Sequence, residues 1–299
     1  MKKVLYPILA VIVFMVMQVV AGIAMIIFAI VKNPTLIDSI KHGTNPETLI
    51  NEIMAGDSLG WALILSGILT VLIIAALKMI DWKTVFNVKI IDWKISMIGI
   101  IGALIGIFYT DVVSEFFDLP NDMEDVFLNM SNTLMGALAI GVIGPVVEEL
   151  IFREAILGYM LKSDVNKWVA IIASALVFGI IHANLAQIPF AIVIGIIFGI
   201  IYYKTGNIVI TSILHIVNNS FAVWTMYSMG EDAKDVSLTE WLGGTGIAVG
   251  ILIPLSVVCF WMLRYFWLSY KSPYYIMTKF RHNAIPQNLN NSQDNETVL

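Results

Sequence analysis

Apolar runs long enough to cross a bilayer recur along almost the whole chain of 299 residues. A membrane-spanning helix needs about 20 predominantly apolar residues, because the hydrocarbon core is roughly 30 Å thick. Such runs lie at residues 4–31, 59–80, 95–116, 131–161, 168–184, 188–203, 207–228 and 246–270. Continuous runs of this kind favour helices over the alternating strands of a barrel. We therefore predict an all-α, polytopic membrane protein, a bundle of about eight transmembrane helices.

The composition narrows the classes of function. Hydrophobic residues make up 59% of the chain and charged residues only 13%, about half the share of a soluble domain. The net charge of -5 argues against a nucleic-acid partner, which calls for a basic face. A single cysteine, Cys259, excludes an internal disulfide framework and a CxxC site. The first apolar run is too long for a signal peptide, so we expect a retained span whose partner is the lipid bilayer.

Positive charge lies mainly on alternate connections between the runs. If the first helix begins inside, 12 Lys and Arg residues fall on cytoplasmic connections and three on the opposite ones. Cytoplasmic loops carry this excess, so we predict a multi-pass protein, in the cell membrane if the source is bacterial, with both termini cytoplasmic.

The pattern of apolar runs divides the chain into four parts. We predict N-terminal helices and loops over residues 1–128, including a loop at 33–57 with one short interfacial helix. A core follows over 129–228, and then the last loop and helix over 229–271. Residues 272–299 lack an apolar cluster and predict a disordered cytoplasmic tail.

Ionisable groups inside spans are costly, about 2.5 to 3.5 kcal/mol each, so each one needs a reason. They lie in three runs. The run 131–161 holds Glu148, Glu149 and Arg153 after Gly144 and Pro145. The run 168–184 holds His182, and the run 207–228 holds His215 and Asn219. At about 1.5 Å per residue, the side chains of Glu148, His182, His215 and Asn219 lie roughly 21, 22, 16 and 22 Å from the nearest cytoplasmic lysines. These polar groups therefore share one layer near the middle of the bilayer.

Spacing predicts which of these groups face one another. Glu149 and Arg153 are four residues apart, so they lie on one helix face and can form an ion pair. Glu148 points about 100° away and is free to face a cavity, and the Gly-Pro pair before it can kink the helix. His215 and Asn219 are also four residues apart and share a face.

This set of groups suits the hydrolysis of an amide. A carboxylate or a neutral imidazole takes a proton from water, while another imidazole and an amide donate hydrogen bonds to the developing oxyanion. No cofactor is required by that scheme. The alternative is a zinc site with Glu148, His182 and His215 as ligands, although the HExxH signature is absent.

Three motifs occur in order in the three runs, EExxxR in PVVEELIFREAIL, FxxxH in SALVFGIIHAN and HxxxN in GNIVITSILHIVNNS. On these motifs, over about residues 135–222, the chain resembles the CPBP family of intramembrane proteases. That family is also called the CAAX protease and bacteriocin-processing or Abi family, and it includes the type II CAAX prenyl proteases. The resemblance marks the core at residues 129–228 as CPBP-like.

The resemblance implies a catalytic role for four residues. Glu148 would activate the water with help from His182, and His215 and Asn219 would stabilise the oxyanion. The family is often described as metalloproteases, whereas its type II CAAX relatives look like glutamate-dependent enzymes without a metal requirement.

Three further positions would support the site. Glu149 and Arg153 match the second Glu and the Arg of the first motif, and Phe178 would pack against His182 and orient it. The position after Arg153, commonly Gly in the family, is Glu154 here. This departure adds a carboxylate near the site.

The first interpretation is an intramembrane endopeptidase that cleaves membrane-associated protein or peptide substrates. Such substrates include a pheromone or bacteriocin-like precursor, a membrane protein segment or a lipidated C-terminus. The second is a proton-coupled transporter with Glu148, His182 and His215 as a relay, against which the missing internal repeats count. The third is a non-catalytic peptide-binding protein of the bacteriocin-immunity kind.

Overall fold

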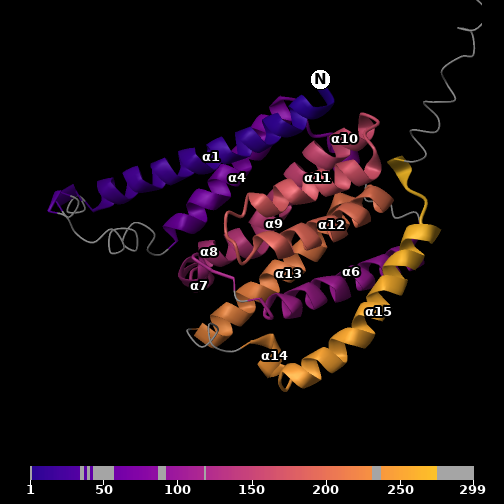
Figure 1. The fold of residues 1–299 in the computed structure, drawn as a ribbon. Coiled ribbons are helices and arrows are strands. Elements are labelled where there is room, and N and C mark those ends of the chain that lie inside the picture. Colours follow the sequence, from indigo (N-terminus) through magenta and orange to yellow (C-terminus); the bar gives the residue numbers. More distant parts are fainter. Residues whose placement is uncertain are drawn as a thin grey trace, which may run out of the picture.

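The computed structural model describes residues 2–33, 37–38, 41–42, 57–86, 92–117, 119–230 and 237–274 (Figure 1). The helices of these ranges are α1 (Lys2–Lys32), α4 (Ser58–Ala76), α5 (Trp82–Val85), α6 (Trp93–Ser114), α7 (Glu124–Ser131), α8 (Leu134–Leu138), η1 (Ala139–Ile143), α9 (Gly144–Glu149), η2 (Leu150–Gly158), α10 (Tyr159–Lys162), α11 (Lys167–Ile180), α12 (Ile188–Thr205), α13 (Ile208–Met229), α14 (Leu238–Trp241) and α15 (Thr245–Ser269). Most of the predicted loop at 33–57 and residues 275–299 of the predicted tail lie outside the described residues.

Seven helices in the described ranges are long and apolar enough to cross a membrane, with Leu134–Lys162 counted as one of them. No strand occurs in those ranges, so the prediction of an all-α polytopic membrane protein is confirmed. The eighth predicted span, 168–184, is a shorter helix, because α11 has only 14 residues. At about 1.5 Å per residue it is roughly 21 Å long and does not cross the hydrocarbon core by itself.

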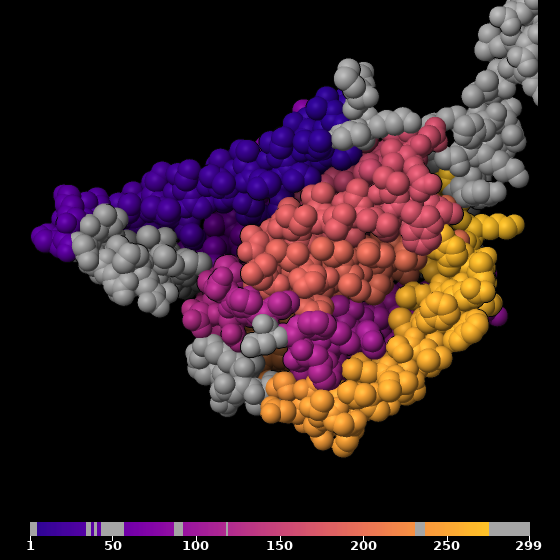
Figure 2. Space-filling model, viewed as in Figure 1, coloured from indigo at the N-terminus to yellow at the C-terminus, as the bar shows by residue number. Residues whose placement is uncertain are grey.

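The helices pack in pairs around the segment from α8 to α10. Helix α1 lies on α4, α6 on α15 and α11 on α12, while α13 packs against η1 and α9. Helices α1 and α15 run along the outside of the bundle (Figure 2). Only 6% of the most apolar window of α1 and 11% of that of α15 is buried within the protein. The apolar side chains that these two helices expose are therefore available to lipid.

Three of the lysines that the alternation of charge assigns to one side do lie at one end of the bundle. The Lys162 ammonium is 3.5 Å from the Asp81 carboxylate, which follows α4. The Lys204 Nζ donates a hydrogen bond of 2.5 Å to the Trp267 carbonyl oxygen near the end of α15. Lys167 lies beside the same tryptophan. We call this end of the bundle the lysine end, and its cytoplasmic location stays a prediction.

The helix that carries the first motif is not a uniform α-helix. Its stretches η1 and η2 have π-helical hydrogen bonding and flank α9, in which Pro145 lies. Pro145 has no N–H to donate to the carbonyls of Ile140 and Gly141, which lie five and four residues earlier. Those carbonyls instead accept hydrogen bonds from the Asn219 amide at 3.0 Å and the Ser220 hydroxyl at 3.1 Å. The proline thus docks the first-motif helix on α13 through side chains, at a π-bulge of the kind that often marks functional sites.

A glycine sets the closest approach between α4 and α8. A Cβ on Gly60 would lie 2.3 to 2.5 Å from backbone atoms of Met135 and Gly136. We expect Gly60→Ala to lower the thermal unfolding midpoint in detergent, because overpacking against rigid backbone costs about 1 to 3 kcal/mol or more. Gly22→Ala on α1 is the matched control, since nothing lies within 4 Å of its Cβ position. Equal midpoints for the two variants would contradict this close packing.

Candidate active site

The centre of the site is a buried ion pair within the first motif. The Arg153 Nε lies 3.1 Å from Glu149 Oε2, and both side chains are fully buried, as the spacing of four residues predicts. The guanidinium carbon also lies 5.0 Å from the centroid of the Phe178 ring and 5.7 Å from that of Phe198. Glu149 Oε2 and the Arg153 nitrogens have no hydrogen-bond partner among the described residues, so the contact is an ion pair, and this pairing offsets part of the cost of burying the Glu149 carboxylate.

The imidazole of His215 lies between the two neighbouring glutamates. Its Nδ1 is 3.2 Å from Glu149 Oε1. Because an ionised carboxylate only accepts hydrogen bonds, Nδ1 carries the proton. The Nε2 atom on the other side of the ring is 3.7 Å from Glu148 Oε2. The buried Glu149 therefore orients His215 so that its second nitrogen faces Glu148.

Glu148 differs from Glu149 in its surroundings. Its side chain is 23% exposed, whereas that of Glu149 is 0% exposed. The buried Oε2 of Glu148 has no hydrogen-bond donor among the described residues, because the distance of 3.7 Å to His215 is too long. The exposed part of the side chain therefore offers the other carboxylate oxygen to water. Adjacent glutamates thus occupy unlike environments, as the turn of about 100° between them predicts.

His182 lies in a turn and not within a helix, which corrects its predicted place in a span over 168–184. Helix α11 ends at Ile180, and Ala183 has a left-handed backbone with a φ of 51°. The His182 Nδ1 donates to the Phe178 carbonyl oxygen at 2.7 Å. In the neutral ring this leaves a lone pair on Nε2. The backbone of the helix end therefore fixes which nitrogen of His182 can act as an acceptor.

Phe178 joins the two histidines. Its ring centroid is 5.0 Å from that of His182 and 5.7 Å from that of His215, both edge to face. The expected packing of Phe178 against His182 is confirmed, and the contact with His215 was not expected. The structure thus brings Glu148, Glu149 and His215 into direct proximity and connects His182 to them through the Phe178 ring.

Asn219 is held by two hydrogen bonds. Its Nδ2 donates to the Ile140 carbonyl, and its Oδ1 accepts from Asn218 Nδ2 at 3.0 Å. One N–H of the Asn219 amide remains for another acceptor. The partner of Asn219 could not be predicted, because Ile140 is 79 residues away and only the packing of α13 on η1 joins them.

Glu154 belongs to a different cluster, which corrects its expected place near the site. Its Oε1 is 2.7 Å from Lys162 Nζ, and its Oε2 accepts from the Tyr202 hydroxyl. The Tyr202 hydroxyl in turn accepts from Tyr274 at 2.9 Å. Burial raises the pKa of Tyr274, so this phenol stays neutral. At the bundle's lysine end, Glu154 therefore fastens α10, α12 and the segment after α15 to one another.

Phe198 on α12 is a part of the site that sequence reasoning missed. Its ring centroid lies 5.3 Å from that of His215, and the ring also covers the Arg153 guanidinium. An aromatic residue inside an apolar run gives no signal that distinguishes it from a lipid-facing one. Its full burial identifies it as a wall of the site.

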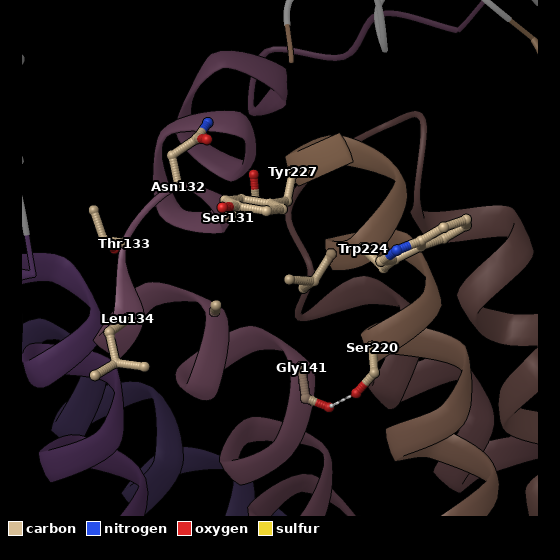
Figure 3. A pocket seen from close by; sticks show the side chains of 10 residues that line it. Ser131, Asn132, Thr133, Leu134, Gly141, Ser220, Trp224 and Tyr227 are labelled. Carbon is tan, nitrogen blue, oxygen red and sulfur yellow. Dashed lines mark hydrogen bonds between the residues drawn. The ribbon is translucent and has the colours of Figure 1, made fainter. Parts of the chain in front are cut away.

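A cavity of about 320 Å³ adjoins the site between the α7–α8 segment and α13 (Figure 3). It is lined by Ser131, Asn132, Thr133, Leu134, Ala137, Gly141, Ser220, Val223, Trp224 and Tyr227. Neither Glu148 nor a histidine lines it. Gly141 and Ser220 line its floor (Figure 3). They are the sequence neighbours of Ile140 and Asn219, so the cavity lies beside the candidate oxyanion donor.

The predicted zinc alternative requires three converging ligands. In the part of the chain that the structure describes, no three His, Cys, Asp or Glu side chains are placed so that they could hold a metal ion. Glu148 and His215 approach each other, whereas His182 contacts the site only through Phe178. A zinc site at Glu148, His182 and His215 stays a prediction that the removal of metal ions tests.

Comparison with known proteins bears on the region that contains all three motifs. Residues 130–221 match the family described as type II CAAX prenyl endopeptidase Rce1-like. The matched range contains all three motifs that carry the resemblance to the CPBP family. The resemblance predicted from the three motifs is therefore confirmed over this range.

Two curated relatives match parts of the chain. The chain is 33% identical over 82 residues to the "Putative membrane peptidase YdiL" of Bacillus subtilis (strain 168), covering 27% of this chain and 33% of that protein. It is 33% identical over 89 residues to the "Membrane-embedded CAAX protease MroQ" of Staphylococcus aureus (strain USA300), covering 28% of this chain and 36% of that protein. The chain thus spans about a third of the length of these relatives. No solved structure matches it significantly.

Proposed function

We propose that the protein is an intramembrane endopeptidase in which Glu148 activates a water molecule. The observation that carries this proposal is the placement of His215 between a buried and an accessible glutamate. The Glu148 side chain is 23% exposed although its Oε2 is buried, so water can reach the carboxylate through its other oxygen. The match of residues 130–221 to the type II CAAX prenyl endopeptidase family supports peptidase chemistry at this site.

In the first step, water bound to the Glu148 carboxylate attacks the carbonyl carbon of the substrate amide. Its proton passes to Glu148, which acts as the general base. The Nε2 lone pair of His182 can hold the second hydrogen of the water, because Nδ1 is committed to the Phe178 carbonyl. The bond formed is C–O, and the negative charge moves to the former carbonyl oxygen.

In the second step, the oxyanion collapses and the C–N bond breaks. Glu148 returns its proton to the leaving nitrogen, so the reaction as a whole consumes one water. The remaining N–H of Asn219 and a protonated Nε2 of His215 donate to the oxyanion. Glu149, held by Arg153, orients His215 throughout, and Phe178 and Phe198 shield these groups.

The substrate is a peptide or protein segment at the membrane, and the cavity beside Asn219 accepts residues that flank the scissile bond. Its exposed Trp224 and Tyr227 suit an apolar segment, while the Ser131 and Ser220 hydroxyls suit its backbone. A lipidated C-terminus and an apolar peptide precursor are both substrates of this kind.

Cleavage of a panel of membrane-proximal and lipidated peptides by purified protein in detergent tests this function. We expect His182→Ala to lower the rate by about 100-fold or more, because the water loses its second acceptor. His42→Ala is the matched control, since His42 is exposed and bonds only to the Asp38 carbonyl oxygen among the described groups. Equal rates for His182→Ala and the wild-type protein would refute the proposed role of His182. If neither the wild-type protein nor a variant cleaves any peptide, the proposal that the protein is a peptidase is refuted.

Removal of metal ions separates this mechanism from a zinc mechanism. We expect a chelator to leave the rate of peptide cleavage unchanged, because the proposed steps use only side chains and water. Loss of cleavage that is restored by added zinc would replace the proposal by a metal site at Glu148, His182 and His215. The inactive His182→Ala variant provides the background rate.

A further inference from the structure

Two lysines at the lysine end of the bundle share one tryptophan. Lys167 begins α11, and Lys204 lies in the last turn of α12. Their Nζ atoms are 5.1 and 4.9 Å from the centroid of the Trp267 ring. The two ammonium groups are therefore at most about 10 Å apart. Lys167 Nζ also lies 5.8 Å from the centroid of the Tyr203 ring, and aromatic rings attract cations without cancelling their charge.

Protein groups leave these charges unbalanced in the described residues. Neither lysine is within ion-pair distance of a described carboxylate, whereas the nearby Lys162 pairs with both Glu154 and Asp81. The Lys204 side chain is buried and donates one hydrogen bond, to the Trp267 carbonyl oxygen. An ammonium group carries three donors, so buried donor capacity remains.

The position of Lys167 is also unfavourable within its own helix. It lies in the first turn of α11, where the helix dipole is positive and a cation is disfavoured. The last turn of α12 favours a cation at Lys204, but neither an ion pair nor its own helix accounts for Lys167 beside it. A bound anion between them would balance both charges.

The surroundings of the two lysines are those of a membrane interface. The Trp168 ring stacks on Trp267 at a centroid distance of 4.8 Å, and the Tyr203 ring stacks on Trp267 at 5.5 Å. Tryptophan and tyrosine are enriched at the level of lipid headgroups. Next to this cluster, Val169, Ile172 and Leu268 expose 56%, 45% and 68% of their surface.

We propose that Lys167, Lys204 and Trp267 form a binding site for the phosphate group of an anionic phospholipid. A phosphate that accepts one charge-assisted hydrogen bond from each ammonium spans roughly 8 Å between the nitrogens, within the limit set by the ring distances. The exposed apolar side chains beside the site lie where acyl chains would run. This apolar surface favours a lipid over free phosphate.

Native mass spectrometry of the full-length protein with added phosphatidylglycerol or phosphatidylcholine tests the site. We expect Lys167→Gln and Lys204→Gln each to weaken phosphatidylglycerol binding about 5-fold, and the double variant about 30-fold. Lys94→Gln is the matched control, because Lys94 lies 5.8 Å from the centroid of a single tryptophan, Trp93, without a second lysine. Its binding should equal that of the wild-type protein.

Further variants and competing ligands identify the ligand and control for misfolding. Lys167→Gln removes a cation from a helix start and should not destabilise the fold, so this variant carries the test if Lys204→Gln does not fold. The double Lys→Arg variant should keep its affinity for phosphatidylglycerol. Equal binding of phosphatidylglycerol by the wild type and Lys167→Gln would overturn the proposal. So would equal binding of phosphatidylcholine, or displacement of the lipid by inorganic phosphate at equal concentration.

Discussion

Replacing Glu148 with Gln is expected to lower kcat/KM for peptide cleavage by about 10²- to 10⁴-fold, the contribution of a general base. The amide keeps the shape of the side chain but does not accept a proton from water. Stability should change little, because Glu148 is partly exposed and its Oε2 has no donor among the described residues. The measurements are peptide cleavage and the thermal unfolding midpoint, both on purified protein in detergent.

Two other carboxyl variants distinguish this role from a general need for negative charge. Glu124→Gln, at the start of α7, should cleave like the wild-type protein. Glu149→Gln should lose both activity and stability, because Glu149 holds Arg153 and His215 in a fully buried position. A Glu148→Gln variant that keeps a tenth or more of the wild-type rate would eliminate Glu148 as the base, whereas a cellular phenotype that survives the loss of cleavage would favour a binding protein.

The relation between the adjacent glutamates could be predicted because it is local. The spacing of Glu149 and Arg153 determines that they meet on one helix face, and helical geometry then directs Glu148 elsewhere. The common depth of the polar groups likewise follows from counting residues along apolar runs. Bilayer thickness and helix rise set these features, and both are known before the fold is.

Contacts between helices could not be predicted in the same way. The apolar run around α11 continues past Ile180, so hydropathy does not reveal that the helix ends before His182. The end depends on the left-handed Ala183, and Asn184 ties the turn to Asn121 by a hydrogen bond of 2.8 Å. The partner of His215 depends on how α13 packs against the first-motif helix. Neither packing arrangement has a periodic signal in one sequence.

The missing N–H of Pro145 illustrates the difference. A kink near Pro145 could be expected from the sequence, because proline removes one helical donor. The hydrogen bonds that Asn219 and Ser220 donate to the freed carbonyls could not be expected, since these partners lie 79 residues away. The site therefore combines a local rule on one helix with a tertiary contact that only the folded bundle reveals.

The second large effect concerns Arg153, which we expect to be essential for the fold. Arg153→Met leaves the Glu149 carboxylate fully buried without its cation, and breaking a buried pair costs about 3 to 5 kcal/mol. The thermal unfolding midpoint in detergent should therefore fall steeply. Lys41→Met provides the matched control, because the Lys41–Asp38 pair is 4.0 Å long and exposed, and such pairs contribute about 0 to 1 kcal/mol.

The double variant Glu149→Gln/Arg153→Met separates the cost of an unpaired charge from the value of the pair. Burial of the neutral Gln amide is cheaper than burial of a lone carboxylate, so much of the lost stability should return. Activity should not return with it, because a neutral amide holds the His215 ring without the charge of Glu149. A double variant less stable than Arg153→Met would mean that the Glu149 carboxylate stabilises the fold through His215 even without Arg153, whereas recovery of cleavage would show that Glu149 is dispensable for orienting His215.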